Sequence, residues 1–409
     1  MASLRFLFGM IPATSKFEAE SDKLRSDYQE YKRFEASDEF KHFLELETKV
    51  NSDDFKKKIR EIKSQNFRQT EEFRKEQEYK KLLKSKIVRK YFKKKDTEKG
   101  KALAESPEVK KLLELEEYVK SAKFSEVKKY MSLSGNQKYA QSEECKEQKE
   151  FQGLVKSEKI IWFKKLKKKY PFSWVEKWDL SFEDKFENAK PDSKTWMNRY
   201  LHGDKILNKG YVMVDDKHAF TEGKNIEIID KKLRIITRRE KGKSLVWDPK
   251  LGFYEKEFDF TSDMVSSANS FSQAYGLIEA KLKFGNSGVS QAFSLMSGQI
   301  LPHVDVVKFE KGKIFSGNYW KNGSGFSKSV SSAGGGKYSG DYHIYTIIWE
   351  SGKITWKING VEFKVQTAGI PDEPLFLVFN SSLKEKSSDK GIPSAFEIDW
   401  VRVYKVKSS

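Results

Sequence analysis

The chain is poor in the residues that build cross-linked or membrane-spanning proteins. It has 409 residues and one cysteine, Cys145, which excludes an internal disulfide framework and fits a reducing compartment. No apolar run approaches the roughly 18–20 residues that span a bilayer. Glycine and tryptophan are scarce at the start, since only four of 25 glycines and one of nine tryptophans precede Pro171. The composition therefore predicts two domains with a boundary near Tyr170 and Pro171.

Positive charge is in excess, and most of it lies before Pro171. The net charge is +18; residues 1–170 hold 43 Lys and Arg against 30 Asp and Glu, and the remainder holds 35 against 30. The short apolar run at the N-terminus is interrupted by Gly9 and Pro12. It is compatible with a cleaved secretion signal or with a small hydrophobic anchor for a partner. We expect a cytoplasmic or particle-associated protein, with a secreted or cell-surface protein as the alternative.

Residues 21–170 repeat a helical pattern after a tail of residues 1–20. The segment Asp38–Phe55, DEFKHFLELETKVNSDDF, recurs in outline later in the chain as Pro107–Phe124, PEVKKLLELEEYVKSAKF. Degenerate copies fall between and after these two, which makes about four units of roughly 35 residues. Serine and aspartate at the breaks are typical helix N-caps. The sequence therefore predicts an all-α repeat region.

The partner of this region stays open at the level of sequence. Lys80–Lys95 and Lys164–Lys169 are basic runs with interleaved aromatic residues such as Phe92 and Trp162, a composition that fits nucleic-acid binding. Thirty acidic residues share the region, however, and Lys–Glu pairs at helical spacing are typical of a solvated helix surface. A spacer or protein-docking array is therefore the better interpretation of this region, and nucleic-acid binding is the less favoured one. An acidic protein and a membrane surface are further alternatives.

After Pro171 the pattern changes to short strands separated by turns. Apolar and polar residues alternate in runs such as Lys232–Thr237, Gly276–Phe284 and His343–Trp349, which predicts half-buried strands. The dipeptide Asn359-Gly360 suits the type I′ turn of a β-hairpin. Residues 171–409 are therefore predicted to form an all-β sandwich.

One of these strands carries a row of titratable residues. In the run His303-Val304-Asp305-Val306, the alternation of strand side chains places His303 and Asp305 on one face and the two valines in a core. Lys308 joins the same face only if a β-bulge inserts one residue near Val307. We predict a shaped cleft with this row on its floor.

The strands together resemble glycoside hydrolase family 16, the laminarinase and β-glucanase family with a concanavalin A-like jelly roll. The resemblance covers about Trp174 to Lys405, and its pieces occur in the family's order: WDLSFEDKF, YGLIEAK, GVSQAFSLM, DYHIYTIIW, ITWKING and FEIDWVRVY. It implies a jelly-roll fold for residues 171–409 and a polysaccharide as the ancestral substrate.

The resemblance also implies that the catalytic residues have been replaced. The active-site strand of the family reads Glu-x-Asp-x-(x)-Glu, so His303 stands at the nucleophile position, Asp305 at the middle and Lys308 at the acid/base position. Retaining hydrolysis needs two carboxyls about 5–5.5 Å apart. A lysine ammonium about 5 Å from the positive transition state costs roughly 3 kcal/mol at an effective dielectric of 20. We therefore predict a pseudoenzyme.

Two functions follow from this prediction, and one alternative opposes it. The chain is expected to be a non-catalytic carbohydrate-binding protein or a structural and assembly protein, whose ligand is a polysaccharide, an anionic glycan or a protein. The His and Lys replacements favour an anionic group. The alternative is an active glycosidase that uses a displaced carboxylate, for which Glu310 and Glu279 are the candidates.

The remaining site residues are also implied by the resemblance. The family's Trp-Pro-Ala-Phe-Trp is Ser290–Ser294 here, so two sugar-contacting indoles are lost. Asp399 falls where relatives bind a structural Ca²⁺; no other cofactor is required. The predicted ligand-binding set is His303, Asp305, Lys308, Tyr319, Trp320, Trp247 and Asn380.

Overall fold

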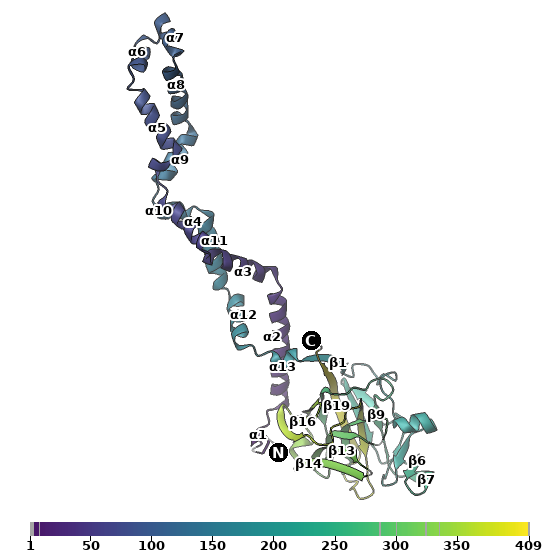
Figure 1. Ribbon diagram of the computed structural model, residues 1–409. Coiled ribbons are helices and arrows are strands. Elements are labelled where there is room, and N and C mark those ends of the chain that lie inside the picture. The colour runs from purple at the N-terminus through teal and green to yellow at the C-terminus, as the bar shows by residue number, and fades with distance from the viewer. Residues whose placement is uncertain are drawn as a thin grey trace. The chain divides into compact units, whose positions relative to one another are not determined.

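The computed structural model describes residues 4–7, 9–285, 288–299, 301–323, 325–334 and 336–407, and it divides the chain into two compact units (Figure 1). One unit is helical and comprises residues 27–170; the other combines residues 1–26 with residues 171–409. The change in composition at Tyr170 coincides with a unit boundary. Residues 1–20, which the sequence sets apart as a tail, fall within the unit of the sandwich.

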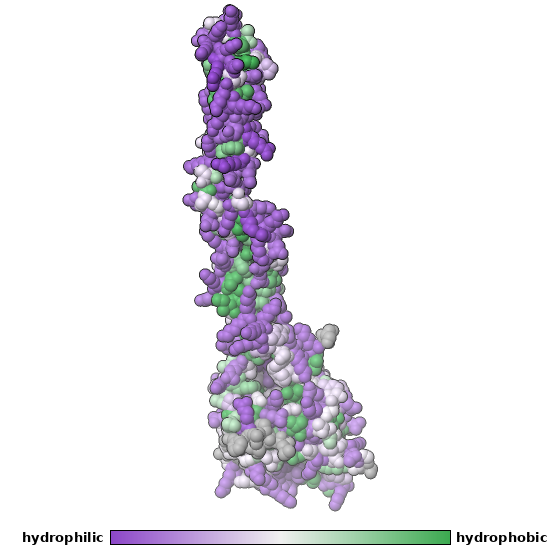
Figure 2. Space-filling model, turned by 60° about the vertical axis from the view of Figure 1, so that its left-hand side comes forward, coloured by the Kyte–Doolittle hydropathy of each residue, from purple (hydrophilic) through white to green (hydrophobic). Residues whose placement is uncertain are grey.

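The helical unit is built from short helices joined by tight breaks. Their bounds are α2 Thr14–Glu35 (which begins in the other unit), α3 Asp38–Asn51, α4 Asp53–Ser64, α5 Glu71–Leu82, α6 Lys86–Lys94, α7 Glu98–Ala104, α8 Pro107–Lys120, α9 Ala122–Ser132, α10 Gly135–Ala140, α11 Glu143–Val155 and α12 Glu158–Lys169. Within the described residues no helix is both long and apolar enough to cross a membrane. The face of the helical unit shown in Figure 2 is mostly hydrophilic.

Regularly spaced N-caps set the helix breaks. The Ser52 hydroxyl accepts a hydrogen bond from the Phe55 backbone N–H, and Ser121 does the same for Phe124 in the later copy of the repeat. Such caps satisfy a backbone donor that the helix itself leaves unpaired. Eight of the helices form four successive pairs, and within each pair the two N-caps are separated by the same number of residues. These N-caps are Ser37 and Ser52, Thr70 and Ser85, Ser106 and Ser121, and Ser142 and Ser157.

The helices run out along the unit and then return. Helix α3 packs on α11, α4 on α10, α5 on α8, and α6 on both α7 and α8. At the opposite end, Tyr31 of α2 stacks on Phe163 of α12 with ring centroids 4.5 Å apart, and Phe34 and Phe40 complete this aromatic cluster. The unit is therefore a helical hairpin whose turn lies between α6 and α7 (Figure 1).

The other unit is a sandwich of two antiparallel sheets. The first sheet has the order β17 Val361–Gln366, β16 Lys353–Ile358, β15 His343–Glu350, β10 Gly276–Lys283, β19 Ser394–Val406, β5 Lys232–Thr237 and β4 Ile226–Ile229, with β1 Trp178–Asp184 also paired to β19. The second has the order β14 Gly325–Gly334, β13 Lys313–Asn322, β12 His303–Glu310, β11 Ser290–Met296, β18 Phe376–Ser382 and β9 Met264–Ser266. The predicted helical repeats followed by a jelly roll are confirmed.

Smaller elements complete this unit. They are α1 Leu4–Leu7, α13 Ser173–Glu176, a π-helical turn at Gly203–Leu207, a three-stranded sheet of β2 Tyr211–Met213, β6 Gly242–Asp248 and β7 Gly252–Phe258, and a two-stranded sheet of β3 Ala219–Phe220 and β8 Thr261–Ser262.

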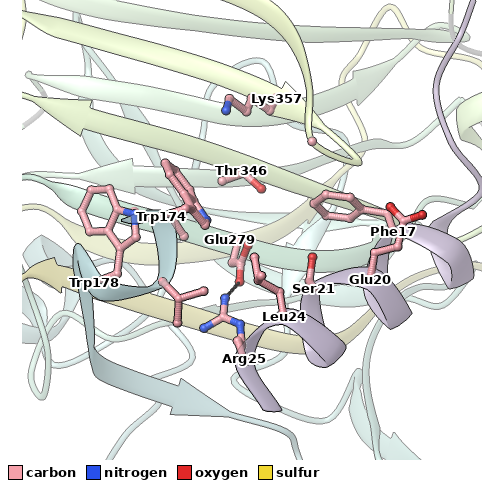
Figure 3. A pocket seen from close by; sticks show the side chains of 13 residues that line it. Phe17, Glu20, Ser21, Leu24, Arg25, Trp174, Trp178, Glu279, Thr346 and Lys357 are labelled. Atoms are coloured by element: carbon pink, nitrogen blue, oxygen red, sulfur yellow. Dashed lines mark ion pairs between the residues drawn. The ribbon is translucent and has the colours of Figure 1, made fainter. Parts of the chain in front are cut away.

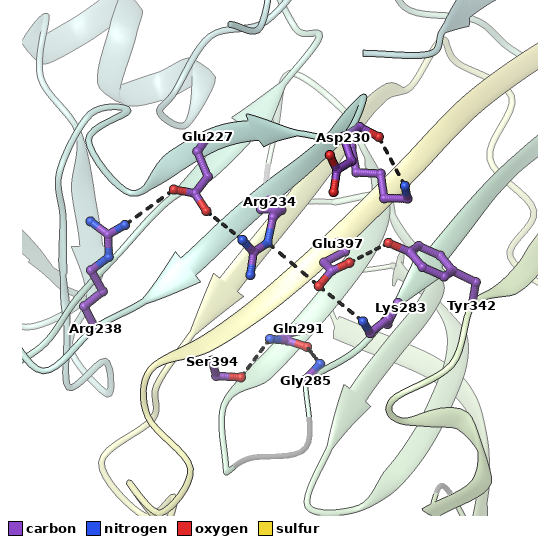
Figure 4. Close-up of polar contacts among 11 residues, drawn as sticks. Glu227, Asp230, Arg234, Arg238, Lys283, Gly285, Gln291, Tyr342, Ser394 and Glu397 are labelled. Atoms are coloured by element: carbon purple, nitrogen blue, oxygen red, sulfur yellow. Dashed lines mark hydrogen bonds and ion pairs between the residues drawn. The ribbon is translucent and has the colours of Figure 1, made fainter. Parts of the chain in front are cut away.

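Alternation along the strands separates the core from the outer faces. Ile278 and Leu282 of β10 and Val304 and Phe309 of β12 are 2% exposed or less and meet in one apolar core between the two sheets. Their neighbours in the sequence point away from that core. Part of the outer face of the first sheet is polar. There, Arg234 lies 2.9 Å from Glu227 and 3.8 Å from Glu397 (Figure 4).

The N-terminal segment is attached to this outer face by polar contacts. The Lys281 ammonium lies 2.8 Å from both Glu18 and Asp399, and the Asn359 amide donates to the Pro12 carbonyl at 3.0 Å. A salt bridge that bridges two carboxylates and is mostly shielded from water is stronger than an isolated surface pair. These contacts account for the assignment of residues 1–26 to the sandwich unit.

Asp263 gives the sandwich a pH-dependent stability. Its side chain is fully buried; one carboxylate oxygen accepts from Thr221, Gly223 and Asn225, and the other has no partner. Burial raises the pKa of Asp263 to about 6. The folded state therefore holds a proton that the unfolded chain releases. The contribution of Asp263 to the free energy of unfolding consequently falls by about 2 kcal/mol as the pH rises from 4 to 7.

We expect an Asp263→Asn variant to lack that fall. Urea unfolding followed by tryptophan fluorescence at pH 4.5 and pH 7 measures it. Asp389→Asn is the control, because Asp389 is an exposed carboxylate paired with Arg239 and its pKa is lowered by that pair. Identical pH profiles for the wild type and Asp263→Asn would contradict the assignment.

Candidate functional site

The titratable row lies on the outer face of the second sheet. The register of β12 with β13 shifts between Asp305 and Lys308, and its register with β11 shifts at the same place. This is the predicted β-bulge, and it turns both Val306 and Val307 into the core. His303 and Asp305 before the bulge and Lys308 and Glu310 after it consequently share one face. We call these four residues the β12 row.

Asp305 is the centre of a hydrogen-bond network. It is 5% exposed; one oxygen accepts from Ser294 at 2.7 Å and lies 2.8 Å from His303 Nε2, and the other accepts from the Tyr319 hydroxyl at 3.2 Å. Burial alone would raise the pKa of Asp305, but His303 and Ser294 outweigh it and hold the pKa below the usual range. Asp305 is therefore a buried carboxylate whose acceptor sites are occupied by protein groups.

Lys308 is paired as well. Its ammonium lies 2.7 Å from Glu310 Oε2, with side chains 32% and 20% exposed. The β12 row thus contains two ion pairs, in which two carboxylates are paired with one histidine and one lysine. The row therefore has no excess positive charge, although the sequence suggested one from His303 and Lys308.

The lost indoles belong to the same face. Ser294 pairs with Asp305 across the two strands, and Ser290 lies on the same side of β11, so tryptophans at these positions would stand over the β12 row. Ser290 and Ser294 offer no aromatic surface over the β12 row, where the resemblance implies two indoles. Asn380 on β18 lies opposite Ala292 in the next position of the sheet.

An apolar layer covers one end of this face. Phe376 and Val378 of β18 and Met264 of β9 pack against side chains from residues 200–258, including Leu201. The end of the sheet formed by β13 and β14 is less covered. Phe326 there is 60% exposed and stacks on Tyr319 with ring centroids 6.1 Å apart. Since Tyr319 bonds Asp305, this aromatic pair is continuous with the β12 row.

Two predicted aromatic ligands lie elsewhere. Trp320 follows Tyr319 in β13 and points to the opposite face, where its indole covers Gly369 so closely that a β-carbon there would overlap it. Trp247 belongs to the three-stranded sheet, and its recorded ring contact is with Phe253 at 4.8 Å. The structure joins His303, Asp305, Lys308 and Tyr319, with Asn380 beside them, and it separates Trp320 and Trp247 from them.

Glu279 lies on the other side of the sandwich. It is in β10 of the first sheet, beneath α2, where Arg25 Nη2 lies 3.5 Å from its carboxylate (Figure 3). Burial raises the pKa of Glu279. The surrounding cavity of about 290 Å³ is lined mainly by apolar and aromatic groups, among them Trp174 and Trp178. Glu279 therefore cannot replace a catalytic carboxylate in the β12 row.

Asp399 does not fit a calcium site. Its carboxylate lies 2.8 Å from the Lys281 ammonium, and a cation is disfavoured beside an existing positive charge. Among the residues that the structure describes, no three His, Cys, Asp or Glu side chains are grouped so as to hold a metal ion. The Ca²⁺ suggested by the resemblance thus has no side-chain support at Asp399.

Comparison with known proteins supports the resemblance. Residues 213–402 match the family described as Glycosyl hydrolases family 16. This part of the chain is similar to family 16 domains, and we call the sandwich that contains it the family 16 domain. Glucan endo-1,3-beta-glucosidase A1 of Niallia circulans is 25% identical over 271 residues, which are 56% of this chain and 38% of that protein. Endo-1,3-1,4-beta-glycanase EglC of Rhizobium meliloti is 24% identical over 157 residues, 36% of this chain and 34% of that protein.

The chain thus spans little more than a third of the length of the curated relatives it matches. Solved structures similar to the family 16 domain include the laminarinase catalytic domain of Thermotoga maritima, with 20% identity, a TM-score of 0.46 and coverage of 57% of this chain and 100% of that one. The endo-beta-1,3-glucanase of Pyrococcus furiosus has 21% identity and a TM-score of 0.45. The match covers 57% of this chain and 96% of that chain.

Proposed function

We propose that the family 16 domain binds a polysaccharide without hydrolysing it. The observation that carries the proposal is the composition of the β12 row. His303 and Lys308 stand where the resemblance places the nucleophile and the acid/base, and the two carboxylates of the row are already paired with them. A retaining glycosidase needs one free carboxylate to attack and one protonated carboxyl to donate.

The electrostatics of the row oppose catalysis. Positive charge develops on the sugar in the transition state, and the lysine ammonium would destabilise it by roughly 3 kcal/mol at about 5 Å and an effective dielectric of 20. Losing general acid and nucleophilic catalysis removes further orders of magnitude in rate. The family 16 domain keeps the scaffold of such a site without its reacting groups.

A neutral glucan is the favoured ligand class. The expectation of an anionic ligand rested on excess positive charge from His303 and Lys308. The ion pairs in the β12 row remove that excess. Tyr319 and Phe326 instead offer aromatic faces, which pack against the C–H face of a sugar ring. One matched relative is named a glucan endo-1,3-beta-glucosidase, and the other is named an endo-1,3-1,4-beta-glycanase. Laminarin and mixed-linkage β-glucan are thus the first ligands to test.

We expect titration calorimetry to detect binding of one of these glucans, and a reducing-sugar assay to detect no hydrolysis. A Phe326→Ala variant should bind about fivefold more weakly, because it loses an aromatic contact worth about 1 kcal/mol. Phe253→Ala is the matched control, since Phe253 is an exposed aromatic residue on the separate β6–β7 hairpin. The control should bind as the wild type does.

Two results would overturn the proposal. One is the absence of binding to laminarin, mixed-linkage glucan and carrageenan alike, which would favour a structural or assembly role. The other is release of reducing sugar that disappears in a Glu310→Gln variant, which would make Glu310 the displaced catalytic carboxylate of an active glycosidase.

A further inference from the structure

The turn of the helical hairpin concentrates positive charge. We define the tip as residues 83–95, which include the end of the α5–α6 connection and all of α6. It holds seven basic residues and no acidic one. The side chains of all seven are exposed: Lys84, Lys86, Arg89, Lys90, Lys93, Lys94 and Lys95.

The tip cations have no recorded ion pair among the described residues, whereas several lysines of the other helices do. Elsewhere in the helical unit, lysines pair with a carboxylate one turn away, as in Lys41–Asp38, Lys75–Glu71 and Lys146–Glu143. Within the residues that the structure describes, it records no ion pair for the seven tip cations. The charge of the tip is therefore not neutralised by the protein.

The acidic side chains around the tip are mostly engaged by other groups. Glu98 of α7 pairs with Lys101, Glu105 with Lys110, and Glu78 of α5 with Lys111. Glu108 of α8 accepts a hydrogen bond from Ser85. Asp96, exposed in the turn itself, has no recorded partner among the described residues, and a single carboxylate cannot balance seven cations.

Apolar side chains are exposed among these cations. Val88 and Tyr91 form the inner face of α6 and pack on Val109 and Leu112 of α8. Leu83, Ile87 and Phe92 lie off that face and are 38%, 36% and 47% exposed. The tip thus presents exposed apolar groups together with cations that have no recorded ion pair.

We propose that the tip binds the surface of an anionic phospholipid bilayer. Clusters of four to eight basic residues on a helix are attracted to anionic lipid, and each lysine near the surface strengthens binding by roughly fivefold. Exposed apolar side chains add to this by entering the boundary between headgroups and acyl chains. Both kinds of group are present in the tip.

Nucleic acid explains the tip less completely. Phosphate contacts would use its lysines, but a duplex offers no apolar layer for Leu83 and Ile87. Only one of the seven cations is an arginine, the residue that most often reads base edges. The lipid surface accounts for both the charge and the apolar groups.

Vesicle sedimentation with the full chain tests the proposal. We expect wild type to bind vesicles of phosphatidylcholine and phosphatidylglycerol in a 7:3 ratio, to bind pure phosphatidylcholine vesicles far more weakly, and to lose affinity as salt is raised. Neutralising Lys90, Lys93, Lys94 and Lys95 together by Lys→Gln changes should lower the partition coefficient by on the order of a hundredfold or more. Circular dichroism at 222 nm verifies that the helices are retained.

A second set of four lysines provides the matched control. Lys165, Lys167, Lys168 and Lys169 of α12 are exposed, and their replacement by Gln changes the net charge by the same amount. Those lysines lie in α12, which is not part of the tip. This control should keep its partitioning within about threefold of wild type.

Charge and apolar contact are then separated. An Ile87→Ser/Phe92→Ser variant keeps every tip charge and should bind the anionic vesicles about tenfold more weakly. The proposal is overturned if wild type does not bind anionic vesicles, if both four-lysine variants lose binding equally, or if a 30-base-pair duplex binds the tip more tightly than the vesicles do. Each of these outcomes leaves the proposed glucan binding by the other unit untouched.

Discussion

An Asp305→Asn variant should lower the free energy of unfolding of the sandwich by about 3 kcal/mol at pH 7. The change removes the negative charge of a side chain that is only 5% exposed. His303, Ser294 and Tyr319 all contact the carboxylate oxygens that carry this charge. A buried network that loses its central acceptor charge leaves its other members poorly paired. Urea unfolding followed by tryptophan fluorescence reports the effect, since eight of the nine tryptophans lie after Tyr170.

The pH dependence of this difference identifies its cause. The pKa of Asp305 is lowered in the folded state, so its stabilisation is complete above the ordinary aspartate pKa of about 3.9 and is lost as the pH falls through the folded-state pKa. Wild type and Asp305→Asn should therefore converge in acid. Glu310→Gln is the control on the same strand, with an expected loss of about 1 kcal/mol or less. A gap that stays constant down to pH 3 would contradict the charge-based explanation.

A Phe163→Ala variant should destabilise the helical hairpin by about 3–5 kcal/mol. Phe163 is 1% exposed and contacts the rings of Tyr31, Phe34 and Phe40, so the substitution leaves a cavity among three aromatic side chains. These rings join α2 and α3 to α12, and the cavity would weaken that junction. Thermal unfolding followed at 222 nm measures the loss.

The same helix supplies a control for this cavity. Ile161 of α12 is 54% exposed, so Ile161→Ala should change stability by less than about 0.5 kcal/mol. Tryptophan fluorescence should show an unchanged unfolding midpoint for the sandwich in both variants. Equal destabilisation by the two substitutions would mean that the aromatic cluster does not hold the hairpin together.

Local patterns in the sequence were sufficient to predict much of the site. Strand alternation placed His303 and Asp305 on one face, and the extra residue before Lys308 required the bulge that β12 contains. The repeated Ser-x-x-Phe pattern at Ser52 and Ser121 likewise marked helix starts. These features are set by residues within four positions of one another, which is why no tertiary information was needed.

Contacts between distant residues were not predictable in the same way. Phe326 lies in a run of Gly and Ser that gives little strand signal, and its place beside Tyr319 depends on the register of β13 with β14. Glu310 cancels the charge of Lys308 only because the bulge puts both on one face. Trp320 is different, since alternation with Tyr319 already argued against a common face.

The order of the units along the chain has a mechanical consequence. The sandwich unit contains residues 1–26 and 171–409, so the helical hairpin is an insertion whose two ends both join the same folded body. A force applied at the hairpin turn is therefore shared by two covalent connections. A protease that cuts between α6 and α7 would also leave both fragments held together, because Glu18 and Pro12 keep their bonds to Lys281 and Asn359.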